Sequence, residues 1–276
     1  MGPRIRSFVR RCFRTSPRKL APIAASAGAC ERVSRGAPVV SVIIPCLDEE
    51  EAIGQVVTAA LSQNVSEAVV VDGGSRDRTV ERAEAAGARV IVEPRRGYGR
   101  AIQAGIAAVR DDADILVFLD GDGSDPAEFI SDLVSPITAG QAVFVLGSRV
   151  RGPRESGSLA PQQLLAAHLG RLLLRLVYGA SFTDLSPFRA IRRDELRRLG
   201  MKEETYGWNL EMLMRVAAAR LPALEIAVGQ RRRIGGASKV SGNFIAGVKA
   251  AWSISATFVR LALELRQQKL LSKKSR

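Results

Sequence analysis

The feature that most constrains the fold is the regular alternation of short apolar segments with helix-like segments between residues 39 and 148. The first apolar segment is rich in β-branched residues and stops at Pro45, as a buried strand would. This alternation predicts an α/β domain with a mainly parallel sheet and flanking helices. The expected strands are 39–44, 68–71, 89–92, 115–119 and 142–146, and the expected helices are 52–62, 79–86, 100–109 and 127–134.

Acidic residues and glycines collect where three of the expected strands end, at 45–51, 72–78 and 120–125. In parallel sheets, ligands bind beyond the carboxyl ends of the strands. We therefore expect these loops to share one edge of the sheet and to form a ligand site. The four consecutive acids at 48–51 are expected in the first turn of the following helix, where they would face the positive end of its dipole.

The second half of the chain has longer helical patterns. Amphipathic helices are expected at 162–178 and 206–220, a strand at 224–228 and a basic loop at 231–239. The apolar segment 244–265 contains charged residues and is too polar to cross a membrane. It fits either a helix in a membrane interface or a helix packed on the domain's own core.

The positive charge of the chain is confined to its ends. The formal net charge is +13, yet residues 39–259 carry 26 basic and 26 acidic side chains. A neutral body argues against a protein that binds nucleic acid over its main face, whereas basic ends fit an anionic membrane surface. We therefore predict no nucleic-acid partner and a cytoplasmic location, peripheral at the cytoplasmic face of the membrane.

Composition divides the chain into four parts. The predicted parts are a disordered basic tail at 1–37, one α/β domain at 38–240, an amphipathic helical segment at 241–265 and a second basic tail at 266–276. The first tail lacks the apolar stretch of a secretory signal, although its composition is similar to that of a transit peptide. Its two cysteines and Cys46 lack metal-ligand spacing and favour a reducing compartment.

Two charged motifs suggest a site for a metal and a phosphate. Asp120 and Asp122, separated by a glycine after a strongly apolar strand, can converge on Mg²⁺ or Mn²⁺. Arg233 and Lys239 flank a glycine pair in the basic loop, where three consecutive arginines need an anionic partner such as phosphate. The alternatives are that the acidic pair stands in a solvated turn and that the basic loop is a solvated hairpin tip. The single histidine, His168, is expected on a helix face, and it excludes a multi-histidine metal centre.

Over 39–258, the ordered motifs resemble those of family 2 glycosyltransferases with a GT-A fold, and among these the dolichol- or polyprenyl-phosphate mannose and glucose synthases. Leu47 replaces the tyrosine of the family's Pro-x-Tyr-Asn-Glu segment, Gly73 replaces an acid of the second motif, and Pro187 replaces a glycine of a later one. The segments that carry the resemblance are 45–49, 71–79, 96–101, 120–126, 147–149, 184–190 and 233–239.

The resemblance implies a role for each matching residue. Asp120 and Asp122 would bind the metal, with Ser124 in a third position. The implied catalytic residues are Asp122, Asp184 and Arg233. The residues that would contact the nucleotide sugar are Pro45, Leu47, Glu49, Val71, Asp72, Leu119, Asp120, Gly121, Asp122, Arg149, Arg233 and Lys239.

The expected activity is metal-dependent transfer of a hexose from GDP-mannose or UDP-glucose to a polyprenyl phosphate. A phosphate acceptor is already ionised, whereas a soluble or glycan hydroxyl acceptor requires a general base. Asp184 is the first candidate for that base, unless it pairs with Arg189 or caps a turn, and Glu211 is the second. A protein that binds the sugar nucleotide without catalysis is the remaining alternative.

Overall fold

A seven-stranded sheet with the order β3-β2-β1-β4-β6-β5-β7 runs through the protein. The computed structural model describes residues 36–159, 161–235 and 255–267. Strand β6 is antiparallel to both its neighbours, β4 and β5, and the other pairs are parallel. The strands are β1 (Val40–Cys46), β2 (Glu67–Asp72), β3 (Arg89–Val92), β4 (Ile115–Phe118), β5 (Phe144–Ser148), β6 (Arg189–Arg192) and β7 (Ala223–Ala227).

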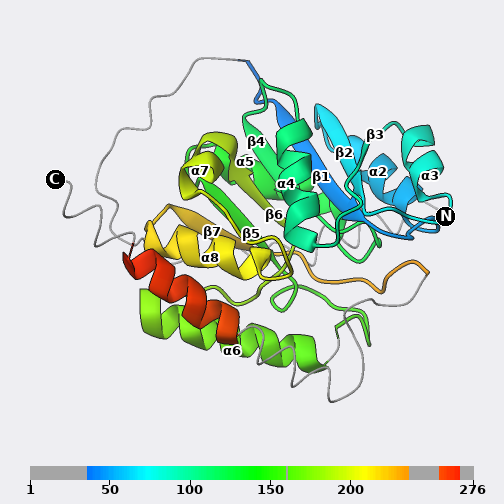
Figure 1. Cartoon of the computed structure of the whole chain (residues 1–276). Helices are drawn as coiled ribbons and strands as arrows, with labels where there is room; N and C mark the ends of the chain where they lie inside the picture. The colour runs from blue at the N-terminus through cyan, green and yellow to red at the C-terminus, as the bar shows by residue number, and fades with distance from the viewer. Residues whose placement is uncertain (1–35, 160, 236–254, 268–276) are drawn as a thin grey trace, which may run out of the picture.

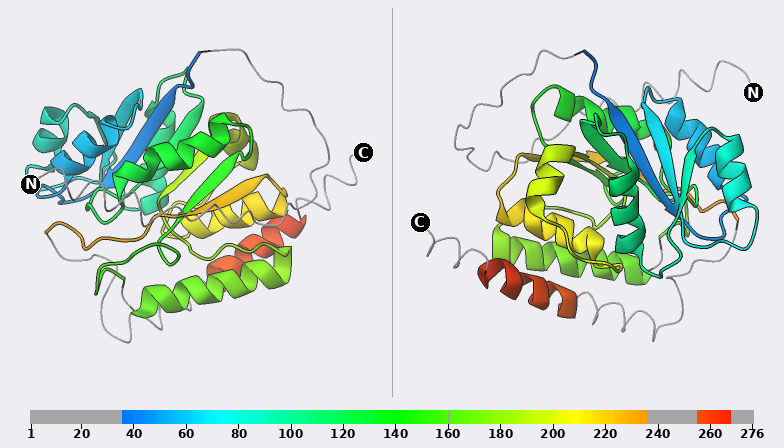
Figure 2. Two further views of the ribbon diagram at one scale, coloured as in Figure 1. Left: turned by 180° about the vertical axis from the view of Figure 1, so that it is seen from behind. Right: turned by 45° about the horizontal axis from the view of Figure 1, so that its top comes forward.

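Helices cover both faces of the sheet (Figure 1). Helices α2, α3 and α5 pack on one face, α4, α7 and α8 pack on the other, and α6 packs on α8 as an outer layer. A last helix, residues 255–267, lies beside α6 in each view (Figures 1 and 2). The helices are α2 (Ile53–Leu61), α3 (Thr79–Ala85), α4 (Tyr98–Ala108), the 3₁₀ turn η1 (Ala127–Phe129), α5 (Ile130–Thr138), α6 (Pro161–Tyr178), α7 (Arg193–Leu199) and α8 (Trp208–Ala218).

Successive residues of the central strands point alternately into two separate hydrophobic clusters, one on each face of the sheet. On β1, Ile43 faces the cluster under α4, α6 and α8, while Val42 and Ile44 face the cluster under α2, α3 and α5. A sheet that is buried on both faces explains why these strands read as continuous apolar runs. Helix α4 lies especially close, since a Cβ on Gly105 would be 2.5 Å from Cγ2 of Ile43.

The predicted α/β class and mainly parallel sheet are confirmed, with element boundaries shifted by a few residues. One prediction is wrong: the acids at 48–51 precede α2, whose first turn contains no acid. They form a loop whose backbone and side chains bind other loops, which is described below. Strand β6 and helix α7 were not predicted from the periodicity of the sequence.

The reversed direction of β6 matters for the site. Its first residue, Arg189, pairs with Phe118, the last residue of β4, and with Leu146 in the middle of β5. The segment that leads into β6 therefore reaches the edge where the parallel strands end. This places the predicted motif at 184–190 beside the loops that follow β4 and β5.

Within the described ranges, no helix is both long enough and apolar enough to span a membrane. Most of the two predicted tails, Lys239 and residues 241–254 lie outside these ranges, so predictions about them stay predictions. The part of the predicted amphipathic segment that the structure describes is helical from residue 255.

Candidate active site

The loops that follow β1 and β2 bind each other at the carboxyl edge of the sheet. The carboxylate of Asp72 closes its own loop by accepting hydrogen bonds from the backbone N–H groups of Gly74 and Ser75, both at 2.9 Å. Ser75 in turn accepts a hydrogen bond from the backbone of Asp48, and the Asp48 carboxylate accepts one from the backbone of Arg76, each at 2.8 Å. Asp72 is buried and shapes the loop, and its predicted contact with the nucleoside stays a prediction.

The loop after β4 is folded tightly against the end of β1. A Cβ on Gly121 would be 2.9 Å from the Cβ of Cys46, so only glycine fits this approach. The Asp122 carboxylate accepts a hydrogen bond from the backbone of Ser124 at 2.9 Å, and that of Asp125 accepts one from the backbone of Asp120 at 3.0 Å. These bonds hold the three carboxylates Asp120, Asp122 and Asp125 within one short turn.

Burial and neighbouring carboxylates raise the pKa of two members of this turn, Asp120 and Asp125. Burial, followed by the charges of Asp125 and Asp122, raises the pKa of Asp120 well above its ordinary value. Burial also raises the pKa of Asp125 to about 7, against the hydrogen bond from the Asp120 backbone. One oxygen of Asp125, Oδ1, is buried and has no hydrogen-bond partner among the described residues. Such a cluster suits a hard divalent cation, which would supply the missing positive charge.

The chain itself would supply few ligands to that cation. In the described part of the chain, no group of three or more histidine, cysteine or acidic side chains has the arrangement of a metal site. Asp120 and Asp122 therefore fit a Mg²⁺ or Mn²⁺ ion that takes its other ligands from water and substrate oxygens. Ser124 is buried next to them, and its predicted role as a third ligand stays a prediction.

The basic loop after β7 lies directly on the acidic turn. The backbone of Arg231 donates to the Ser124 carbonyl at 3.0 Å, and that of Ile234 donates to the Asp122 carbonyl at 2.9 Å. Between them, the Arg233 guanidinium donates to Glu49 at 2.6 Å and lies 3.9 Å from the Asp122 carboxylate. The structure thus brings together Glu49, Asp122 and Arg233, three predicted site residues from three distant loops.

All three consecutive arginines have partners within the protein, Arg233 with Glu49 as described above, which corrects the expectation that the whole run needs a phosphate. Arg231 pairs with Glu128. Arg232 donates from its backbone to Glu155 and from its side chain to the Ser156 carbonyl, both at 2.7 Å. Arg233 is the member of the run that lies beside the acidic turn.

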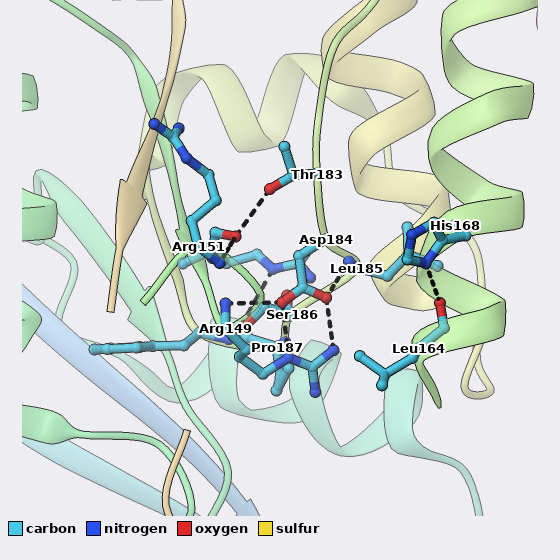
Figure 3. A network of polar contacts seen from close by, with 12 residues as sticks. Arg149, Arg151, Leu164, His168, Thr183, Asp184, Leu185, Ser186 and Pro187 are labelled. Atoms are coloured by element: carbon cyan, nitrogen blue, oxygen red, sulfur yellow. Dashed lines mark hydrogen bonds and ion pairs between the residues drawn. The ribbon is translucent and has the colours of Figure 1, made fainter. Parts of the chain in front are cut away.

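Asp184 and Arg149 form a buried ion pair at the same edge (Figure 3). The guanidinium donates from Nε and Nη2 to the two carboxylate oxygens at 2.9 and 2.8 Å, and the Arg149 backbone donates at 2.9 Å. Burial alone would raise the pKa of Asp184, but the charge and hydrogen bonds of Arg149 outweigh it and lower that pKa. Burial lowers the pKa of Arg149, but the charge and hydrogen bond of Asp184 outweigh it and raise that pKa. Asp184 therefore pairs with Arg149 rather than with Arg189 and is a weak proton acceptor.

Arg189 supports the loop that presents this pair. It is fully buried, and its guanidinium donates to the backbone carbonyls of Pro187 at 3.2 Å, of Asn209 at 3.1 Å and of Ser186. Burial lowers its pKa to about 10. An arginine that binds only carbonyls acts as a brace, fixing the segment between Asp184 and β6 against α8.

The second predicted base, Glu211, is also held by hydrogen bonds within the protein. It is fully buried and accepts hydrogen bonds from the Arg215 side chain at 2.8 Å and from the backbones of Lys202 and Glu203. Its contacts fix the loop after α7. His168 is exposed on α6 and contacts the Leu164 carbonyl at 2.8 Å, as expected of a helix-face residue (Figure 3).

The remaining predicted contacts lie at the same edge but differ in exposure. Leu47 is half-buried and borders the loop after β2, where a Cβ on Gly73 would be 3.6 Å from it. Pro45 is buried, and so are the core residues Val71 and Leu119. Only the backbone of such core residues is suited to contact a bound nucleotide.

One site residue was missed as a functional candidate. The phenol of Tyr98, at the start of α4, donates to Oδ1 of Asp120 at 3.2 Å, and its ring stacks on Tyr206 with centroids 6.1 Å apart. The sequence signal was present, because Tyr98 stands between two glycines in the segment 96–101. Those glycines are needed for docking, since a Cβ on Gly99 would be 2.2 Å from the Glu203 carbonyl.

An open α/β sheet whose carboxyl edge holds a carboxylate cluster under an arginine loop is the arrangement expected of a GT-A glycosyltransferase. Residues 41–200 match the profile of glycosyl transferase family 2, and the chain belongs to that family. The chain is therefore an enzyme, a glycosyltransferase, and the non-catalytic alternative is set aside.

The chain is similar to several glycosyltransferases, and two of them have names that indicate different acceptors. A Mycobacterium tuberculosis protein named as an uncharacterised glycosyltransferase is 37% identical over 208 residues, which are 74% of this chain and 90% of the relative. A dolichyl-phosphate hexose transferase of Haloferax volcanii is 32% identical over 199 residues, 71% and 84% of the two chains. A crystal structure of glucosyl-3-phosphoglycerate synthase from M. tuberculosis with Mg²⁺ and uridine diphosphate has a TM-score of 0.63 at 25% identity, covering 82% of this chain and 79% of that one.

Proposed function

We propose that the enzyme transfers a hexose from a nucleotide diphospho-sugar to a polyprenyl phosphate. The observation that carries the proposal is the pairing of both candidate bases with arginines, Asp184 with Arg149 and Glu211 with Arg215. A carboxylate held this way is a poor base for a hydroxyl acceptor. A phosphate acceptor is already ionised near neutral pH and attacks without losing a proton.

The chain's own residues then have distinct tasks. Asp120 and Asp122 hold the divalent cation, and Tyr98 orients Asp120. Arg233, 3.9 Å from Asp122, neutralises the departing diphosphate. Mg²⁺ or Mn²⁺, when bound, stabilises negative charge on that diphosphate. The remaining predicted donor contacts, including Glu49, Asp72 and Lys239, belong to this proposal.

Arg149 is suited to the acceptor. Its Nε and Nη2 bind Asp184, and among the described residues Nη1 makes no hydrogen bond. Asp184 fixes the guanidinium plane, and Nη1 keeps two N–H groups for a phosphate oxygen. In this proposal Asp184 positions Arg149 and does not remove a proton.

The comparisons support two acceptor classes. The dolichyl-phosphate hexose transferase favours a lipid phosphate, and the phosphoglycerate-named synthase favours a small soluble acceptor. The uridine diphosphate in the latter structure favours a UDP-sugar donor over GDP-mannose. A soluble phosphorylated acceptor is therefore the second candidate function.

A donor and acceptor screen tests the proposal. Radiolabelled UDP-glucose and GDP-mannose are incubated with the full chain and Mg²⁺ or Mn²⁺, with either polyprenyl phosphate in detergent or 3-phosphoglycerate. Product is partitioned between organic and aqueous phases, and Asp122→Ala is the inactive control. Label in the organic phase that requires metal supports the lipid acceptor. Label confined to the aqueous phase with 3-phosphoglycerate overturns it in favour of the soluble acceptor.

A further inference from the structure

Most of the exposed large apolar side chains in the described part of the chain gather on two helices. Eight such residues are exposed there, and six of them lie on α6 or on the helix at 255–267. We call these six the leucine face: Leu165, Leu172, Leu176, Val177, Val259 and Leu263. The two helices lie side by side in both figures, and the rings of Tyr178 and Phe258 touch edge to face with centroids 6.3 Å apart.

Helix α6 is apolar on two opposite sides. Leu174, Ala167 and Gly170 are buried and face the protein. At about 100° per residue, Leu165, Leu172 and Leu176 lie within about 40° of one another on the opposite side. Leu176 is 72% exposed. A helix that is apolar on both sides normally has cover on both sides.

The charges beside the leucine face indicate what kind of surface covers it. Helix α6 contains no acidic residue, and Arg171 and Arg175 are exposed on one flank of its outer stripe. On the last helix, Arg266 is exposed, and the single acid, Glu264, pairs with Arg260. In a symmetric dimer, the same patch would meet itself and bring these arginines together. An anionic lipid surface instead offers headgroups to the arginines and acyl chains to the leucines.

From these observations we infer that the leucine face docks on the surface of an anionic bilayer. This inference rests on the proposed lipid acceptor, and it assigns the contact to the folded body rather than to the basic tails. Helix α6 packs directly on the residue that follows Asp184, since a Cβ on Gly170 would be 2.9 Å from Cδ1 of Leu185. Asp184 with Arg149 is the pair proposed to meet the acceptor phosphate. Docking α6 therefore brings the acceptor half of the site to the surface that contains the lipid.

Vesicle sedimentation of the full chain tests this inference. Vesicles of phosphatidylcholine alone and of phosphatidylcholine with phosphatidylglycerol are compared at low and high salt, because salt screens the tails but not apolar insertion. The variant Leu172→Glu/Leu176→Glu adds charge to the leucine face. Val92→Glu is the matched control, since Val92 is 59% exposed on the edge strand β3.

We expect Leu172→Glu/Leu176→Glu to weaken binding to the mixed vesicles by at least about tenfold at high salt, while Val92→Glu binds as the unchanged protein does. Arg171→Gln/Arg175→Gln should reduce the preference for phosphatidylglycerol at low salt. The leucine variant and the control should both keep the activity toward detergent-solubilised acceptor.

Three results would overturn the inference. Unchanged vesicle binding by the leucine variant means that the face does not meet the bilayer. A change of oligomeric state in sedimentation velocity with unchanged vesicle binding means that a second copy covers it. A fall in melting temperature that Val92→Glu does not share means that residues 236–254 or another part of the chain cover it. In each case, organic-phase product in the detergent assay would leave the proposed function standing.

Discussion

Two groups of carboxylates in the protein are held in opposite ways. Asp120, Asp122 and Asp125 stand within one turn, and none of them accepts a hydrogen bond from an arginine in the described ranges. Asp184 and Glu211 each accept one from an arginine at 2.8 Å. The first group concentrates negative charge, whereas the second has it neutralised.

The difference shows which group serves a ligand and which serves the fold. Burial and mutual repulsion raise the pKa values of Asp120 and Asp125, so ionising the cluster opposes folding. The pKa of Asp184 is lowered, so its ionised form supports folding. Groups that oppose folding in the absence of a ligand are frequent at functional sites. Substitutions in the two groups should therefore have opposite effects on activity and stability.

The largest expected effect is on catalysis, from Asp122→Ala. Loss of this carboxylate should lower kcat/KM by at least about 10³-fold, because the cation and the charge that it stabilises in the transition state lose their anchor. Stability in metal-free buffer should be unchanged or higher, because one repelling charge is gone. Steady-state release of nucleoside diphosphate and urea unfolding measure the two quantities.

An exposed acid provides the control for this comparison. Asp112→Ala removes a carboxylate from a surface pair with Arg110 and should change neither quantity appreciably. If Asp122→Ala keeps most of its activity, or loses stability in metal-free buffer, the assignment of the acidic turn to a cation is wrong.

The next effect is on stability, from Asp184→Asn. It leaves the Arg149 guanidinium, whose side chain is 12% exposed, without its counter-charge. Breaking a buried pair from one side should lower the free energy of unfolding by about 3 kcal/mol. Urea unfolding of Asp112→Asn, which breaks an exposed pair, should show a change near zero.

Steady-state kinetics of Asp184→Asn distinguish a positioning role for Asp184 from a role as a base. If Asp184 only positions Arg149, Asp184→Asn should raise KM for the acceptor more than it lowers kcat, with the shape of the pH profile unchanged. Loss of the acidic limb of that profile, along which the rate rises as a base ionises, would show that Asp184 removes a proton, and the comparison between the two groups would fail.

The third prediction concerns pH. A carboxyl whose pKa is raised in the fold contributes stability at low pH and loses it as pH rises through the folded value. For Asp125, this means a loss between about pH 4 and about 7, on the order of 2 kcal/mol in metal-free buffer after relaxation around the charge. Mn²⁺ should restore the stability above about pH 7. Urea unfolding at several pH values, with chelator or with Mn²⁺, measures this change in the free energy of unfolding. If Asp125→Asn shows the same dependence on pH as the unchanged protein, Asp125 is not the cause.

The sequence predicted the loops that hold the acidic turn better than it predicted the pairing of Asp184 with Arg149. Periodicity and glycine-rich acidic strand ends predicted the loops after β1, β2 and β4, because each strand is a local apolar run. The pairing of Arg149 with Asp184 was beyond that reasoning, since it depends on the reversed strand β6. That strand has four residues, begins and ends with arginine, and pairs with β4 residues more than seventy positions away.

The acids at 48–51 show why local rules also failed within the well-predicted half. Their spacing fits a helix start, yet the backbones of Glu49 and Glu50 donate to Thr79 and Asp77, and the Glu49 side chain binds Arg233. Partners about thirty and 184 positions away decide their conformation. The resemblance to known motifs supplied what periodicity could not, the presence of Arg233 at the same site.

The smallest expected effect comes from Tyr98→Phe, which keeps the ring against Tyr206 and removes only the hydroxyl that donates to Asp120. Loss of one hydrogen bond to a carboxylate corresponds to about 1 kcal/mol, or about fivefold weaker apparent affinity for Mn²⁺. We expect kcat at saturating metal to change little, because the hydroxyl positions a ligand and does not contact the reacting atoms. Tyr206→Phe is the control, since this ring is 64% exposed and the substitution preserves the stacking. Equal Mn²⁺ dependence in Tyr98→Phe and the unchanged enzyme would show that Asp120 is positioned by its loop alone, and the cluster would then need no support from α4.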